Sequence, residues 1–131
     1  GVPLAQIGVR SLSREEDRFR QEQGIPFVDA DNLHAGAGAD FALPAGFPES
    51  VYVTFDVDVF DASLMPATGT PEPGGLFWYQ VLDSLRGLLH GRKLVGADVV
   101  ELAPIPTLHH CDYTAAKLVY TLMGLALAGP A

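Results

Sequence analysis

Cysteine, charge and long apolar runs are all scarce in this sequence, and each scarcity narrows what the protein can be. The single Cys111 excludes an internal disulfide and agrees with a reducing compartment. No signal peptide is visible, and no uninterrupted apolar run reaches about 18 residues. We therefore expect a cytoplasmic protein that does not enter a membrane.

Positive charge is especially scarce. The 8 lysine and arginine residues are outnumbered by 16 aspartate and glutamate residues, for a net charge of −8. This balance disfavours nucleic acid and anionic membranes as partners and mildly favours a cationic ligand. Charged residues make up only 18% of the chain, which suggests that part of its surface is buried against another segment or subunit.

The length of 131 residues and the apolar content of 48% are those of one ordinary domain with a sizeable core. The sequence begins at Gly1 and reaches a strand-like run almost at once, which we interpret as a piece of a longer chain. Apolar runs then alternate with amphipathic segments. This alternation favours an α/β fold with a parallel sheet and helices on both faces.

The expected elements follow from periodicity and from capping residues. Ser13 and Glu16 form a capping-box pattern at the start of the first helix, and Gly24 and Gly91 are helix stops. The predicted strands are residues 4–9, 25–30, 51–60 and 94–102. The predicted helices are residues 14–23, 76–89 and a last one capped by Asp112 or Thr114 and reaching about Ala128, while residues 32–50 are predicted to be a loop.

The most informative stretch is an apolar strand that ends in aspartates and leads into a loop rich in proline and glycine. Alternate side chains of a strand share a face, so Asp56 and Asp58 should point the same way, with Cβ atoms roughly 6.5–7 Å apart. Two carboxylates at the end of an apolar strand repel each other, and a metal ion is the simplest compensation. The alternative is that Asp56, Asp58 and Asp61 only end the strand and cap turns.

Other metal and phosphate patterns fit poorly. An EF-hand loop counted from Asp56 fails at its fifth, sixth and twelfth positions, and no P-loop or dinucleotide-binding glycine pattern occurs. His34 has no second histidine or cysteine at ligand spacing, so we interpret it as a solvated loop side chain. The adjacent residues 109–111, His-His-Cys, cannot easily converge on one ion, and we assign them a loop or cap role.

The segment Asp56-Val57-Asp58-Val59 also resembles the opening motif of the haloacid dehalogenase-like phosphatases. There the first aspartate would be a nucleophile and the second a general acid, with magnesium beside them. That motif usually opens a chain, and the proline- and glycine-rich loop has no role in its scheme. We keep this phosphatase as an alternative function.

A second resemblance covers nearly the whole chain. The segments that carry it read LAQIGVRSLSREE at 4–16, FDVDVFDASLMPATGTPEPGGL at 55–76, GADVVELAPIP at 96–106 and TAAKLVYTLM at 114–123. They resemble the C-terminal part of the ureohydrolases, the arginase and agmatinase family. The resemblance implies that residues 1–131 are the C-terminal portion of a single three-layer, arginase-like α/β domain. It is agmatinase-like because LAPIP, rather than an Asn-Pro pair, follows Glu101.

In that family a two-manganese centre activates a hydroxide that attacks the guanidinium carbon and releases urea and an amine. The resemblance implies that Asp56 bridges two Mn ions and that Asp58 completes the coordination of one. It also implies that Glu101 holds the guanidinium of a small cationic guanidino substrate, with Thr70 close by. A homo-oligomer is expected.

The sequence also departs from the family pattern. The Gly-Gly-Asp/Glu-His and Asp-Ala-His-x-Asp segments that supply the remaining metal ligands do not occur, nor does the catalytic histidine. Ala62 stands where a proline usually follows the third aspartate. We therefore expect no catalytic residue within these 131 residues and little activity from them alone. A non-catalytic remnant or assembly module of the same fold is the competing interpretation.

Overall fold

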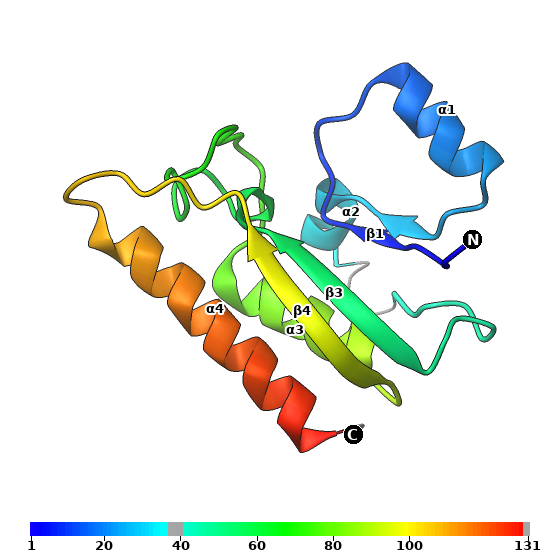
Figure 1. Ribbon diagram of the computed structural model, residues 1–131. Coiled ribbons are helices and arrows are strands. Elements are labelled where there is room, and N and C mark those ends of the chain that lie inside the picture. Colours follow the sequence, from blue (N-terminus) through cyan, green and yellow to red (C-terminus); the bar gives the residue numbers. More distant parts are fainter. Residues whose placement is uncertain (37–40, 130–131) are drawn as a thin grey trace.

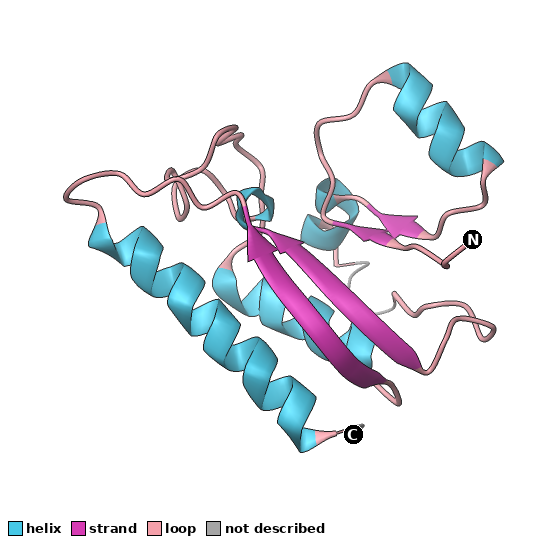
Figure 2. Cartoon of the chain, in the orientation of Figure 1, coloured by secondary structure: helices cyan, strands magenta, loops and turns pink. Residues whose placement is uncertain are grey.

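The computed structural model describes residues 1–36 and 41–129 (Figure 1). Strands and helices alternate along the chain, as Figure 2 shows. The elements are β1 Gln6–Ile7, α1 Arg14–Glu22, β2 Phe27–Val28, α2 Ala30–His34, β3 Ser50–Asp56, the 3-10 turn η2 Val57–Val59, α3 Trp78–Leu89, β4 Lys93–Val100 and α4 His109–Ala128.

The strands form two parallel pairs, β1 with β2 and β3 with β4. The predicted parallel α/β class is therefore confirmed, although the described strands form two separate two-stranded sheets rather than one continuous sheet. The first two strands are also much shorter than predicted. A register shift between Val51 and Tyr52 interrupts the otherwise regular pairing of β3 with β4.

The first helix begins as its sequence predicts. Ser13 Oγ accepts a hydrogen bond from the amide of Glu16, and the Glu16 carboxylate accepts one from the amide of Ser13, which completes the capping box. The helix ends before Gly24, whose φ of 62° lies in the left-handed region.

Three expectations about local structure are wrong. Residues 30–34 form the short helix α2, so the predicted loop 32–50 begins later than expected; residues 37–40 of that prediction lie outside the described residues. The last helix begins at His109, with Leu108 as its N-cap residue and no side-chain cap, so neither Asp112 nor Thr114 caps it. Residues 109–111 form its first turn, so the loop or cap role predicted for them is also wrong.

The main core lies on one face of the β3 and β4 pair. Val51, Val53 and Phe55 point inward from β3 because alternate residues of a strand share a face. They belong to one buried cluster with apolar residues of both long helices, which lie beside this sheet in Figure 1. The helix residues in the cluster are Val81, Leu85 and Leu89 of α3 and Cys111, Leu118 and Leu122 of α4. Trp78 stacks on Phe60 with ring centroids 6.1 Å apart, as expected for a packing residue.

A buried arginine holds together the smaller unit formed by β1, α1 and β2. Arg20 is 5% exposed and donates two hydrogen bonds to the carboxylate of Asp29, at 2.7 and 2.6 Å, and one to Asp17 at 2.9 Å. Its guanidinium carbon also lies 3.6 Å from the centroid of the Phe27 ring. These partners compensate the buried charge of Arg20, and the sequence pattern of the helix did not predict the contact.

Candidate active site

Asp56 and Asp58 lie close together in the structure, but the backbone geometry that relates them differs from the one predicted. Strand β3 ends at Asp56, and Asp58 lies in the 3-10 turn that follows, so the alternation of a strand does not relate the two side chains. Instead, the amide of Asp58 donates a hydrogen bond of 3.0 Å to Asp56 Oδ1. This side-chain cap begins the turn and ends the strand.

The carboxyl group of Asp56 lies in surroundings that destabilise its ionised form. Burial raises the pKa of its carboxyl above the ordinary value, and the negative charges of Asp58 and Glu101 add to this rise. The hydrogen bond from the amide of Asp58 acts in the opposite direction. Three acidic groups from the ends of β3 and β4 therefore influence one another, and a cation placed among them would be stabilised.

Glu101 follows β4 directly and has an unusual backbone. Its φ is 65°, a left-handed conformation that a residue with a side chain rarely adopts. Strand β4 ends at Val100, so Glu101 does not continue the alternation of Val99 and Val100. Glu101 Oε2 lies 3.8 Å from the place where a Cβ atom on Gly69 would be. Glu101 therefore faces the loop that follows the aspartates.

We call residues 66–75 the site loop. Thr70 Oγ1 in this loop donates a hydrogen bond of 3.1 Å to Asp58 Oδ2, so the residue predicted to lie near the substrate contacts a predicted metal ligand. The amide of Ala103, just beyond Glu101, donates to the carbonyl of Ala67 at 2.9 Å. All four predicted site residues, Asp56, Asp58, Thr70 and Glu101, thus lie in one connected part of the structure.

Asp61 fixes the shape of the site loop. Its carboxylate accepts hydrogen bonds from Ser63 and from the amides of Gly74 at 2.8 Å and Gly75 at 3.2 Å. The bonds from Ser63 are the main cause that lowers the pKa of Asp61 to about 2. A Cβ atom on Gly75 would lie 2.5 Å from backbone atoms of Phe60 and Asp61, so only glycine fits this close approach. The capping role considered for the aspartates thus describes Asp61, and it also describes the contact of Asp56 with the amide of Asp58.

His34 has a structural contact that the sequence did not reveal. Its Nε2 lies 3.0 Å from the carbonyl of Gly75, and its Nδ1 lies 3.4 Å from Gln80 Nε2. Gln80 in turn accepts a hydrogen bond from the amide of Phe77 at the start of α3. His34 is therefore a link between α2, the site loop and α3, rather than a freely solvated side chain.

The sequence also did not predict a cluster of three polar side chains on β3 and β4. Tyr52 and Thr54 both donate hydrogen bonds to Asp98, at 2.9 and 2.7 Å, on the exposed face of β3 and β4. The hydrogen bond to Asp98 raises the pKa of Tyr52. The sequence could not predict this cluster because the pairing of Thr54 with Asp98 depends on the register shift near Tyr52.

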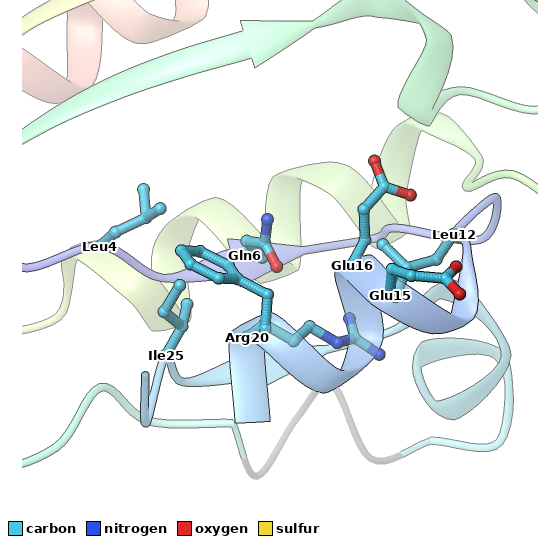
Figure 3. A pocket seen from close by; sticks show the side chains of 8 residues that line it. Leu4, Gln6, Leu12, Glu15, Glu16, Arg20 and Ile25 are labelled. Atoms are coloured by element: carbon cyan, nitrogen blue, oxygen red, sulfur yellow. The ribbon is translucent and has the colours of Figure 1, made fainter. Parts of the chain in front are cut away.

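A cavity in the N-terminal part of the structure lies away from these residues. Figure 3 shows a pocket of about 350 Å³ between β1 and α1, with an apolar wall and two glutamates at one end. The residues that line it are Leu4, Gln6, Leu12, Glu15, Glu16, Phe19, Arg20 and Ile25. It contains no predicted site residue, so we do not assign the chemistry to it.

The carboxylates of Asp56 and Asp58 are suitable metal ligands, but they are only part of the set of ligands that a metal ion requires. Carboxylate oxygens are hard ligands, and burial together with the neighbouring charges of Asp58 and Glu101 raises the pKa of Asp56. Within residues 1–36 and 41–129, however, no group of three or more histidine, cysteine, aspartate or glutamate side chains is arranged to hold a metal ion. The residues present therefore fit a divalent cation chemically but provide an incomplete set of ligands.

The similarity to known proteins extends over almost the whole chain. A model of the Arginase family matches residues 2–124. This chain belongs to the arginase family. It is 42% identical over 126 residues to the agmatinase of Pyrococcus horikoshii, and the match covers 96% of this chain and 44% of that protein. It is 40% identical over 126 residues to the N(1)-aminopropylagmatine ureohydrolase of Thermus thermophilus, covering 95% of this chain and 42% of the relative.

Solved structures confirm the arginase-like fold. The agmatine ureohydrolase of Thermoplasma volcanium superposes with a TM-score of 0.78 at 28% identity, over 94% of this chain and 42% of that one. The arginase of Medicago truncatula gives a TM-score of 0.76 at 31% identity, over 94% and 39% of the two chains. The ureohydrolase resemblance is thus confirmed, and this chain spans less than half the length of these relatives.

Membership of the arginase family also affects the two alternative interpretations, the phosphatase and the non-catalytic module. It removes the main support for the phosphatase interpretation, because the Asp56 to Val59 motif is now explained by the arginase family match. A non-catalytic module of the same fold is the remaining competitor to an active ureohydrolase. Among the described helices, none is both long and apolar enough to cross a membrane.

Proposed function

We propose that the complete protein containing this chain is an agmatinase-like ureohydrolase, which hydrolyses a small cationic guanidino compound to urea and an amine. The observation that carries the proposal is the convergence of Asp56, Asp58, Thr70 and Glu101 at the carboxyl ends of two parallel strands. Relatives named as agmatinase and N(1)-aminopropylagmatine ureohydrolase support the guanidino substrate class.

In this proposal the carboxylates divide into two roles. Asp56 and Asp58 would hold manganese, which arginase family members typically bind, and Asp56 would bridge two ions. Bound manganese supplies a water nucleophile that is deprotonated near neutral pH. The ligands that these 131 residues lack would have to come from elsewhere in the complete protein.

Glu101 would bind the substrate. Its carboxylate carries the charge and the planar geometry that match a guanidinium, and it faces the site loop rather than the core. Such a contact would orient the guanidinium carbon next to the metal ligands. Thr70 would keep Asp58 in place through its hydroxyl and lie close to the same substrate group.

Two measurements test the proposal. The complete protein, loaded with manganese, should release urea from agmatine or from a longer aminopropyl analogue. Isothermal titration should show that the 131-residue chain alone binds manganese weakly or not at all, because two carboxylates satisfy only part of a divalent shell. Asp56→Ala should abolish any residual binding.

The outcomes separate the two remaining interpretations. Failure of the manganese-loaded complete protein to release urea from any guanidino compound would support the non-catalytic module. Tight manganese binding by the 131-residue chain would instead mean that further ligands lie within it, with Asp31 and His34 the first residues to replace.

A further inference from the structure

Arg10 contacts backbone carbonyl groups on both sides of the candidate active site. Its Nη2 donates hydrogen bonds of 2.7 Å to the carbonyl of Asp58 and 2.7 Å to the carbonyl of Glu72. Longer bonds reach the carbonyl of Phe60 at 3.4 Å and, from Nε, the carbonyl of Pro73 at 3.3 Å. One side chain from the segment after β1 thus joins the 3-10 turn to the site loop.

These contacts are unlike those of Arg20, the buried arginine of the same N-terminal part of the chain. Arg20 pairs with carboxylates, whereas Arg10 takes part in no ion pair within the described residues. No backbone amide in the described part of the chain donates to the carbonyl of Asp58 or Glu72. Removing the guanidinium would therefore leave two carbonyls without a protein partner, which costs more than losing a contact between exposed groups.

The hydrogen bonds form a closed ring around Asp58. Arg10 holds the backbone of Asp58, the Asp58 carboxylate accepts from Thr70, and the backbone returns from Thr70 to Glu72, which Arg10 also holds. The guanidinium is planar and rigid, so it fixes the distance between the turn and the loop. That distance determines whether the hydroxyl of Thr70 can reach the carboxylate of Asp58.

Close packing brings β1 to this position. Gly8, just after β1, lies so near η2 that an added Cβ atom would be 2.5 Å from Val59 Cγ2. His34 from the same N-terminal part of the chain contacts the site loop two residues beyond Pro73, at Gly75. The C-terminal end of the loop is therefore attached to two segments that precede β3 in the sequence.

We propose that Arg10 is a positioning residue that sets the orientation of the Asp58 carboxylate for metal binding without touching metal or substrate. The proposal rests on the proposed function for the identity of the ligand, manganese. It extends that function because it assigns a role at the site to a residue outside the two strand ends that carry the acidic groups.

The experiment compares Arg10→Ala and Arg10→Lys with Ser13→Ala in the complete protein. Ser13→Ala is the matched control, since it weakens the same N-terminal unit through the helix cap, and Ser13 has no hydrogen bond to the turn or the loop within the described residues. Manganese affinity is measured by electron paramagnetic resonance below the melting temperature of each variant. Steady-state kinetics of urea release and amide hydrogen exchange are measured on the same preparations.

Arg10→Ala should weaken manganese binding at least ~10-fold and lower kcat more than it raises KM, because the loss of charge-assisted bonds releases Asp58. Arg10→Lys, which keeps the charge but only part of the geometry, should restore some of the affinity. Ser13→Ala should lower Tm and leave manganese affinity unchanged. Equal manganese affinity in Arg10→Ala and the parent protein would overturn the proposal.

Hydrogen exchange keeps the proposal testable if the complete protein releases no urea and binds no manganese. The amides of Asp58, Gly74, Gly75 and Leu76 should then exchange at least ~10-fold faster in Arg10→Ala than in Ser13→Ala. Unchanged exchange at these amides would show that the turn and the loop hold their shape without Arg10. Should Arg10→Ala not fold, the same comparison with Arg10→Lys decides between these outcomes.

Discussion

Thr70 donates its hydroxyl hydrogen to the carboxylate of Asp58 at 3.1 Å, so a residue of the site loop and a residue of the preceding turn form one unit. This contact gives Thr70 two possible roles in the complete protein. It can hold Asp58 in place, or it can contact the substrate as the family resemblance implies. The two roles predict different kinetic effects.

Thr70→Val removes the hydroxyl and keeps the shape of the side chain. We expect manganese affinity to fall at least ~10-fold, because a hydrogen bond to a charged group contributes about 1.5–3 kcal/mol. Manganese titration and the kinetics of urea release check this. Thr70→Ser, which retains the hydroxyl, is the control. A higher KM with unchanged manganese affinity would assign Thr70 to the substrate alone.

Asp61 provides a pH-dependent test of the site loop. Its pKa in the folded protein is lowered to about 2, chiefly by hydrogen bonds from Ser63, against about 3.9 in an unfolded chain. A lowered pKa contributes stability above the unfolded value, and this contribution is lost as the pH falls through the folded value. Asp61→Asn should therefore lower Tm above pH 5, and the difference from the parent should shrink between about pH 4 and pH 2.

Thermal unfolding from pH 7 to pH 2 measures this difference. Asp83→Asn is a suitable control, since Asp83 is an exposed aspartate whose carboxylate, among the described residues, pairs with Arg86 on α3 alone. A Tm difference for Asp61→Asn that stays constant down to pH 2 would contradict the assigned role of the carboxylate.

The sequence predicted the location of β3 and β4 better than the residues at which the strands end or the local geometry of the candidate site. Local patterns determine much of the fold: the capping box of Ser13 and Glu16 and the alternating β3 are both found where expected. The pairing of Asp56 with Asp58 was predicted from strand alternation, yet it arises from a 3-10 turn. Aspartate side chains cap amides two residues on, and that local preference ends the strand at Asp56.

The contacts of Arg10 and His34 could not be predicted in the same way. Each joins segments some 40 or more residues apart in sequence, and nothing near either residue indicates its partner. The left-handed backbone conformation of Glu101 could not be predicted from the sequence pattern either. Such a conformation is disfavoured for glutamate and must be imposed by the surrounding structure. These features therefore depend on packing between segments that are distant in the sequence, which hydrophobic periodicity does not predict.

The exposed apolar side chains predict that the 131-residue chain associates with itself. On α4, Tyr113, Tyr120 and Leu127 are 73%, 70% and 87% exposed, and β3 carries Tyr52 at 61%. Apolar patches and unpaired strand edges both favour association. Size-exclusion chromatography with light scattering should show species larger than the 13.9 kDa monomer. Replacing Tyr120 and Leu127 by glutamate should reduce their size, whereas a stable monomer of the unmodified chain would contradict the prediction.

Glu101 gives the sharpest separation between substrate binding and metal binding in the complete protein. Glu101→Gln keeps the size of the side chain and its backbone but removes the charge that would meet a guanidinium. We expect two manganese ions to stay bound while kcat/KM falls at least ~100-fold, about 2.7 kcal/mol of transition-state stabilisation. Asp56→Asn should instead lose manganese and activity together, because a neutral amide replaces the carboxylate proposed to bridge the two ions. Metal analysis and urea release on both variants distinguish the two roles, and agmatine hydrolysis by Glu101→Gln at the rate of the parent would show that another group holds the guanidinium.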